Sequence, residues 1–183
     1  MTSVNFQIKS DWTLFLDRDG VINERINGDY VKTLQQFRFL PGAGESIAKL
    51  SAIFCRIIVV TNQQGVGKGL LKESDLNLIH NLMRLDVVKL GGKIDAVYFA
   101  PYLAAENHPW RKPGTGMALQ AKADFPEIDF HKSVMVGDSL SDMEFGKALG
   151  MKTVFIHPEP HPHPLIDIVF PSLSDFCANI PTI

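Results

Sequence analysis

The sequence has only two cysteines, Cys55 and Cys177, and they lie far apart in a chain of 183 residues. Such a pair offers no disulfide framework of the kind that staples small secreted proteins. The start of the chain also lacks the apolar run that follows a charged stretch in a secretory signal. We therefore expect a protein of the reducing cytoplasm.

Charge of one sign and long apolar runs are also scarce. The formal net charge is -2, and no block of Lys or Arg interrupts the chain, so the electrostatic surplus typical of nucleic-acid binders is missing. Arg, Gln or Pro breaks each apolar run within about ten residues, whereas roughly 20 are needed to cross a bilayer. We expect neither nucleic acid nor a membrane as a partner.

What the chain does contain is a hydrophobic fraction of 45%, enough for one domain over residues 1–183 with a substantial core. Short β-branched and aromatic runs alternate with amphipathic stretches. The predicted strands are 12–16, 57–61, 94–99, 134–136, 153–156 and 166–170, and the predicted helices are 43–54, 73–90, 115–124, 142–149 and 172–179. This alternation predicts an α/β fold with a Rossmann-like parallel sheet, helices on both faces and ligands at the carboxyl ends of the strands.

Two carboxylates follow the first predicted strand directly, in Asp17-Arg18-Asp19-Gly20. The same letters could begin a calcium-binding loop. That loop would need oxygen-bearing side chains at its fifth and twelfth positions, and the chain has Val21 and Gly28 there. The pair therefore favours a catalytic role at the end of the strand.

Three further polar clusters follow other predicted strands. Thr61 and Asn62 end the second strand, Lys112 follows the third, and Asp138 and Asp142 follow the fourth. A parallel sheet would bring all of these clusters to one edge.

The order of these clusters over residues 12–156 resembles the haloacid dehalogenase superfamily. Asp17 and Asp19 match its first motif, Thr61 its second, Lys112 its third, and Asp138 with Asp142 its fourth. The resemblance implies a Mg²⁺-dependent phosphatase with an aspartyl-phosphate intermediate.

By the same resemblance, Asp17 is the nucleophile and Asp19 the acid and base. Thr61 donates a hydrogen bond to the phosphoryl group, and Lys112 supplies positive charge. The expected metal ligands are the Asp17 carboxylate, the Asp19 carbonyl and the Asp138 carboxylate. Asp142 is expected to orient metal-bound water. We also expect Asp17 to raise the pKa of Asp19, so that Asp19 can hold a proton near neutral pH.

The intervals between the motifs are too short for a separate cap domain. Between Gly20 and Pro41 there is room only for a hairpin flap, for which Asn27-Gly28 supplies a turn. A capless chain with these motifs resembles the D-glycero-D-manno-heptose 1,7-bisphosphate phosphatases and the related histidinol phosphatases. This resemblance implies a small phosphate monoester as substrate, most specifically the heptose bisphosphate, with Arg111 and Asn62 as substrate-binding residues. We expect a monomer.

One departure concerns zinc. The branch carries a Cys-Xaa-His…Cys-Xaa-Cys loop before Arg-Lys-Pro, but the matching residues 100–110 here hold none of the expected thiols and a single histidine, His108. We expect no zinc, because one imidazole cannot build a four-coordinate site. Ser139 also stands where this branch often has Lys.

Alternative functions stay open at this point. Histidinol phosphate or another small phosphate ester could be the substrate. A phospho-accepting receiver domain also uses a strand-end Asp with magnesium, Thr and Lys, but an acid and base at Asp19 favours turnover over signalling. The glycine-rich run 65–69 fails the spacing of a nucleotide-binding loop, and we expect it to be a flexible connection.

Overall fold

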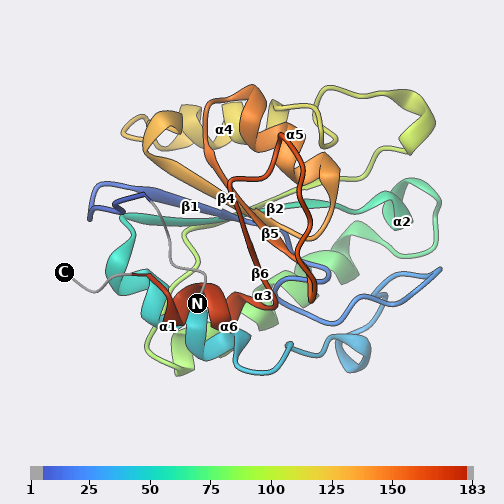
Figure 1. Ribbon diagram of the computed structural model, residues 1–183. Helices are drawn as coiled ribbons and strands as arrows, with labels where there is room; N and C mark the ends of the chain where they lie inside the picture. Colours follow the sequence, from blue (N-terminus) through green and yellow to red (C-terminus); the bar gives the residue numbers. More distant parts are fainter. Residues whose placement is uncertain (1–5, 181–183) are drawn as a thin grey trace.

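The computed structural model describes residues 6–180, which form one six-stranded sheet in the order β3-β2-β1-β4-β5-β6 (Figure 1). All neighbouring strands are parallel. The strands are β1 (Thr13–Leu16), β2 (Arg56–Asn62), β3 (Ala96–Ala100), β4 (Ser133–Gly137), β5 (Lys152–Ile156) and β6 (Ile168–Phe170). Strand order reverses between β1 and β4, so the crevice at the carboxyl ends of these two strands is the expected place for a ligand.

Helices cover both faces of the sheet, as the sequence predicts. In Figure 1, α1 (Ala43–Ile53), α3 (Glu73–Lys89) and α6 (Leu173–Ala178) lie below the sheet. Helices α4 (Gly116–Asp124) and α5 (Leu140–Ala148) lie above it. The short α2 (Gln64–Gly67) and the 3-10 turns Leu34–Gln36, Ala104–Glu106 and Phe130–Lys132 complete the elements.

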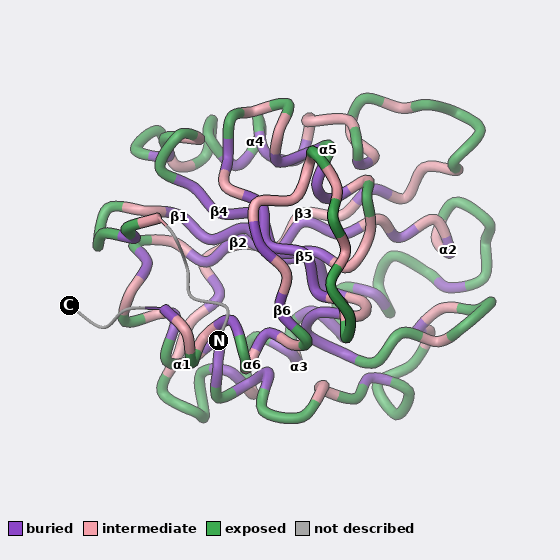
Figure 2. The backbone as a smooth tube through the Cα atoms, in the orientation of Figure 1, coloured by how far each residue is buried: buried purple, intermediate pink, exposed green. Residues whose placement is uncertain are grey.

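The sheet separates two hydrophobic cores because successive side chains of a strand point to opposite faces. Leu14, Leu16 and Ile57 pack against the lower helices, whereas Phe15 and Ile58 pack against the upper ones. All five are fully buried, and each such side chain contributes roughly 1.5–3 kcal/mol to folding. Figure 2 shows the resulting buried band along the central strands. No helix within residues 6–180 is long and apolar enough to span a membrane.

The predicted elements are confirmed, with ends that move by a few residues. Gly150 follows α5 at φ 78°, the left-handed conformation expected of a residue that ends a helix. Two predictions about loops are wrong. The Asn27-Gly28 turn is present, with Gly28 at φ 74°, but no pair of strands flanks it, so the flap is an irregular loop. The run 65–69 is also not a plain loop, since most of it forms α2.

No separate cap domain stands over the sheet edge in the described part of the chain. The segment between β1 and α1 contains one 3-10 turn, and the segment between β2 and β3 contains α2 and α3. The carboxyl ends of the strands are therefore reached from solvent past the flap and α2.

Candidate active site

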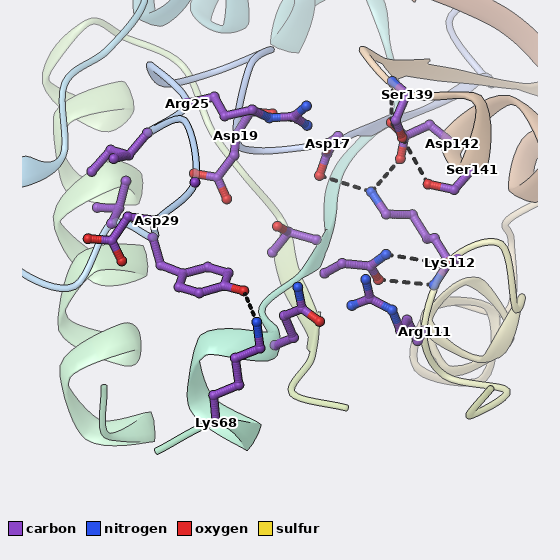
Figure 3. A pocket seen from close by; sticks show the side chains of 17 residues that line it. Asp17, Asp19, Arg25, Asp29, Lys68, Arg111, Lys112, Ser139, Ser141 and Asp142 are labelled. Carbon is purple, nitrogen blue, oxygen red and sulfur yellow. Dashed lines mark hydrogen bonds and ion pairs between the residues drawn. The ribbon is translucent and has the colours of Figure 1, made fainter. Parts of the chain in front are cut away.

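A cavity of about 560 Å³ opens at the carboxyl ends of β1, β2 and β4. That volume suits a small ligand. Figure 3 shows the side chains that line it. They are Asp17, Asp19, Arg25, Ile26, Gly28, Asp29, Tyr30, Val31, Thr61, Asn62, Gln64, Lys68, Arg111, Lys112, Ser139, Ser141 and Asp142.

Asp17 lies at the centre of this edge. Its backbone N–H donates to Val136 O at 2.9 Å, which continues the pairing of β1 with β4 by one residue. The side chain is only 9% exposed. Burial raises the pKa of Asp17 to about 6, although the ammonium group of Lys112 acts in the opposite direction. The carboxylate is therefore poorly hydrated and held beside a cation.

Lys112 contacts residues from different sequence motifs. Its Nζ lies 2.9 Å from Asp17 Oδ1 and 2.6 Å from Asp142 Oδ1 (Figure 3). It also donates to Val60 O at 2.7 Å. The side chain is buried, which alone would lower its pKa, but the two carboxylates raise the pKa above its ordinary value. The ammonium therefore stays charged in the interior, between two carboxylates and a carbonyl oxygen.

Asp142 serves two partners with its two oxygens. Oδ1 faces Lys112, while Oδ2 accepts from the Ser139 N–H at 3.1 Å and from the Ser139 hydroxyl at 2.6 Å. The second set of contacts caps the first turn of α5. Gly137 makes this approach feasible, because a Cβ there would overlap the Asp142 side chain. The cap thus fixes the carboxylate that holds Lys112.

Asp138 stands on the other side of Asp17. Burial raises the pKa of Asp138 to about 7, and the negative charge of Asp17 adds to this shift. Gly20, at φ 89°, lets the first loop pass so close that any side chain there would collide with the Asp138 carboxylate. Arg25 reaches across the flap and donates to Asp138 Oδ1 at 2.7 Å.

The residues present fit a magnesium ion. Carboxylate oxygens of Asp17, Asp138 and Asp142 lie within 4.8 Å of one another. Burial is the largest cause of the raised pKa values of Asp17 and Asp138, and the negative charge of Asp17 adds to the shift at Asp138, so the two carboxylates are poorly hydrated and Asp17 repels the charge of Asp138. A hard divalent cation with oxygen ligands relieves that repulsion, and magnesium is held in this way by one or two carboxylates.

Asp19 is held by four donated hydrogen bonds. Arg18 Nη2 donates to both carboxylate oxygens at 2.9 Å, Asn23 donates at 2.9 Å and Gln63 at 2.7 Å. Burial would raise the pKa of Asp19, but the Arg18 charge and these bonds lower it below its ordinary value. The expectation that Asp17 raises this pKa above its usual range is therefore wrong: the donors outweigh burial, and Asp19 is ionised in the free protein.

Thr61 and Asn62, the two predicted site residues at the end of β2, have different partners. Thr61 Oγ1 accepts from Gln63 Nε2 at 2.9 Å, which leaves the Thr61 hydroxyl proton to point elsewhere. Asn62 uses its amide to hold Lys112, because Nδ2 donates to Lys112 O and Oδ1 accepts from Lys112 N, both at 3.0 Å. Asn62 lines the cavity, but its contacts mainly fix the backbone of Lys112.

Cationic side chains stand at the mouth of the cavity. Arg111 is half-buried and donates to Tyr102 O at 3.3 Å. Lys68, from the end of α2, donates to the Tyr30 hydroxyl at 3.0 Å (Figure 3). Both line the same cavity as Asp17. The mouth is thus suited to a second anionic group of a ligand.

The loop before Arg111 is held by aromatic contacts. The rings of Tyr102 and His108 stack with centroids 3.4 Å apart and an interplanar angle of 13°. His108 Nδ1 accepts from the Trp110 N–H at 3.1 Å, and Trp110 Nε1 donates to Phe99 O at 2.9 Å. These contacts connect both ends of the loop to β3.

Sequence reasoning missed several residues in and around this site, among them Arg25, Gln63, His80 and Tyr30. Arg25 and Tyr30 belong to the irregular flap, where no periodic pattern indicates direction. Gln63 lies next to the predicted Thr61 and Asn62, so its position was a usable signal. His80 falls among Leu76, Ile79 and Met83 on the buried face of α3, where a polar ring calls for a partner.

Comparisons with known proteins agree with this geometry. Residues 109–172 match the model of a family described as HAD-hydrolase-like. The chain is 44% identical over 133 residues to D-glycero-alpha-D-manno-heptose-1,7-bisphosphate 7-phosphatase of Mycobacterium tuberculosis, covering 73% of this chain and 70% of that protein. It is 39% identical over 146 residues to D-glycero-beta-D-manno-heptose-1,7-bisphosphate 7-phosphatase of Rhodopseudomonas palustris, covering 75% of this chain and 78% of that protein.

A solved structure is similar over nearly the whole chain. It is the D,D-heptose 1,7-bisphosphate phosphatase of B. bronchiseptica complexed with magnesium and phosphate, with a TM-score of 0.82 and 27% identity. The match covers 91% of this chain and 96% of that one.

Proposed function

The chain belongs to the haloacid dehalogenase-like phosphatases that include the heptose-bisphosphate phosphatases, and from this premise we propose that it removes the 7-phosphate of D-glycero-D-manno-heptose 1,7-bisphosphate. The observation that carries the proposal is Lys112, which lies between Asp17 and Asp142 at the base of a cavity with further cations at its mouth. Phosphoryl transfer requires a carboxylate nucleophile and positive charge together at one point.

In the proposed reaction, a carboxylate oxygen of Asp17 attacks phosphorus and the ester bond to the sugar breaks. The negative charge of a bound phosphate raises the pKa of a carboxylate beside it, so Asp19 takes up a proton from solvent when the substrate binds and gives that proton to the departing alkoxide. Asp19 then takes a proton from the water that attacks the aspartyl phosphate, so that inorganic phosphate leaves and Asp17 is restored. Splitting one hard displacement into two easier ones is the general gain of covalent catalysis.

Lys112 and Thr61 hold the transferring oxygens in this mechanism. Lys112 stays charged beside Asp17 and can stabilise negative charge that develops on phosphorus-bound oxygens. The Thr61 hydroxyl already accepts from Gln63, which leaves its proton for a phosphoryl oxygen.

We propose that Asp17 and Asp138 with their carboxylates, and Asp19 with its carbonyl, hold magnesium. When bound, magnesium supplies positive charge that lets a carboxylate approach a phosphate dianion. Asp142 is a candidate for orienting a water of the ion. Its carboxylate, however, already serves Lys112 and Ser139.

The substrate is inferred from the cations of the cavity and from the names of the relatives. A bisphosphate presents one phosphate to Asp17 and a second to Arg111, whose planar fork suits an anionic oxygen pair. Histidinol phosphate, the alternative, carries an ammonium group, and this group would meet Arg111 and Lys68 unfavourably. We propose that a monomer, formed as one domain, carries out this reaction, because one chain supplies every residue of the mechanism.

The test is a panel of sugar, amino-alcohol and nucleotide phosphates, assayed with and without Mg²⁺. The wild-type protein should prefer the heptose bisphosphate, and Asp17→Asn should abolish hydrolysis of every ester while keeping the wild-type circular dichroism spectrum and melting behaviour. Turnover by Asp17→Asn near the wild-type level, after mass spectrometry has excluded reversion to Asp, would contradict the mechanism. Preference for another ester would overturn the substrate alone.

A further inference from the structure

Arg18, which separates the two aspartates of the first motif, carries a fully buried side chain. A guanidinium is rarely removed from water unless its N–H groups find partners. Nη2 donates to both carboxylate oxygens of Asp19, each at 2.9 Å. Within residues 6–180, Nε has no hydrogen-bond partner. The orientation of this side chain therefore depends on the hydrogen-bond partner of Nη1.

Nη1 meets His80, which comes from α3, 62 residues further along the chain, at 3.1 Å from Nε2. His80 is 4% exposed, and its ring lies 5.9 Å, centroid to centroid, from the Phe99 ring. A guanidinium has no acceptor atom, so Nε2 must accept and the proton of the neutral ring must sit on Nδ1. Burial and the Arg18 charge lower the pKa of His80 to about 3, which keeps the ring neutral.

We propose that His80 is a positioning residue of the phosphatase reaction, which holds the Arg18 guanidinium so that it presents Asp19 to the cavity. The guanidinium is planar, so an acceptor on Nη1 fixes the orientation of the Nη2 edge that binds Asp19. Without that acceptor, Arg18 would have both Nε and Nη1 unpaired in a dry interior and would turn toward other oxygens. The inference rests on the proposed role of Asp19 as acid and base.

The first test measures the wild-type enzyme, with one variant used only for assignment. Nitrogen-15 NMR of the His80 ring in the wild-type enzyme at neutral pH should show Nε2 unprotonated and Nδ1 protonated. The His80→Gln protein identifies the resonances of this ring by their loss. A proton on Nε2 would overturn the proposal, because that nitrogen could not accept from Arg18.

The second test separates positioning from a structural role by the leaving group. The substrates are p-nitrophenyl phosphate, whose phenolate leaves without a proton, and the sugar phosphate that the wild-type enzyme hydrolyses best. The constant to compare is kcat/KM, because it covers only the steps up to formation of the aspartyl phosphate. It therefore includes protonation of the leaving group but not the later hydrolysis. A loss of folded protein lowers both constants equally, whereas a displaced Asp19 lowers that of the sugar phosphate more.

We expect His80→Leu to lower kcat/KM for the sugar phosphate by about tenfold or more and that for the aryl phosphate by less than about threefold. His80→Gln, which can offer an amide oxygen near the place of Nε2, should stay within about threefold of wild type on both. Should His80→Leu fail to fold, Arg18→Lys replaces it, because an ammonium keeps the charge but cannot span His80 and both Asp19 oxygens.

Asp19→Asn is the reference that separates the two proposals. If Asp19→Asn lowers kcat/KM equally for both esters, the proposed role of Asp19 is wrong, and the inference about His80 is wrong with it. If Asp19→Asn lowers kcat/KM more for the sugar phosphate than for the aryl phosphate, but His80→Leu does not, the inference about His80 alone is wrong.

Discussion

Arg25 places its guanidinium on the carboxylate of Asp138, with Nη2 at 2.7 Å from Oδ1 and at 3.3 Å from the carbonyl oxygen of Asp19. These two groups are among the proposed ligands of magnesium. A guanidinium and a divalent cation cannot share the same lone pairs, so the arginine and the ion compete for them. Because the Arg25 side chain is 47% exposed, water screens its charge and the competition is modest.

Arg25→Gln should therefore bind Mg²⁺ more tightly than the wild-type protein. An exposed ion pair contributes up to about 1 kcal/mol, which corresponds to about fivefold in the dissociation constant. Isothermal titration with Mg²⁺ in the absence of substrate measures the change. Arg84→Gln is the matched control, since it makes the same change of charge at a side chain that donates to Asp95 O, before β3. Unchanged or weaker binding by Arg25→Gln would contradict the competition.

The purified protein should contain no stoichiometric zinc. The loop 100–110 has the stacked pair of Tyr102 and His108 and the Trp110 bond to Phe99 O to hold its shape. Elemental analysis of protein purified without chelator should give well below one zinc per chain, and a chelator should leave the melting temperature unchanged. One tightly held zinc per chain would refute this prediction.

His80 should make the protein less stable in mild acid. Its pKa of about 3 in the folded protein lies below the ordinary value of 6.5, so the unfolded chain binds the proton more readily. The associated stability is complete above about pH 6.5 and is lost as the pH falls toward about 3. At about pH 5 the loss should be about 2 kcal/mol relative to about pH 7.5.

Urea unfolding at both pH values, with a chelator present, measures this difference in wild type and in His80→Gln. The variant should lack the His80 part of the pH dependence, while the carboxylates with raised pKa values act alike in both proteins. The same slope in the two proteins would mean that His80 is not a buried neutral ring.

Much of the site could be predicted because parallel strands bring their carboxyl ends to one edge. Asp17, Thr61 and Asp138 each follow a run of buried residues, so their meeting requires only the order of the strands. The α/β fold was predictable for a related reason, since strands buried on both faces and helices buried on one carry different periodicities.

Contacts between distant side chains were not predictable in this way. Arg25 and Asp138 are 113 residues apart, and the flap that carries Arg25 has neither strand nor α-helix to fix its direction. The lowered pKa of Asp19 depends on donors from Arg18, Asn23 and Gln63, and motif spacing does not record their angles. The short helix α2 was missed because its two glycines favour a loop by propensity.

Arg111 should determine which phosphate ester the protein prefers. Arg111 lines the cavity half-buried, and its Nη1 donates only weakly, at 3.3 Å, to a carbonyl, so the guanidinium can turn to a phosphate. Arg111→Ala should cost roughly 2 kcal/mol or more in transition-state stabilisation for the heptose bisphosphate, which is about 30-fold in kcat/KM. Monophosphates, which have no second phosphate to hold, should lose less.

The measurement is kcat/KM for the heptose bisphosphate and for histidinol phosphate, in wild type, Arg111→Ala and the control Arg84→Ala. A wild-type preference for the bisphosphate that shrinks in Arg111→Ala, but not in the control, supports a phosphate held at the mouth while the other reacts at Asp17. Preference for histidinol phosphate, or equal losses on both esters in Arg111→Ala, would instead indicate a substrate with a single phosphate. In that event Arg111 stabilises the loop through its bond to Tyr102 O and does not bind the substrate.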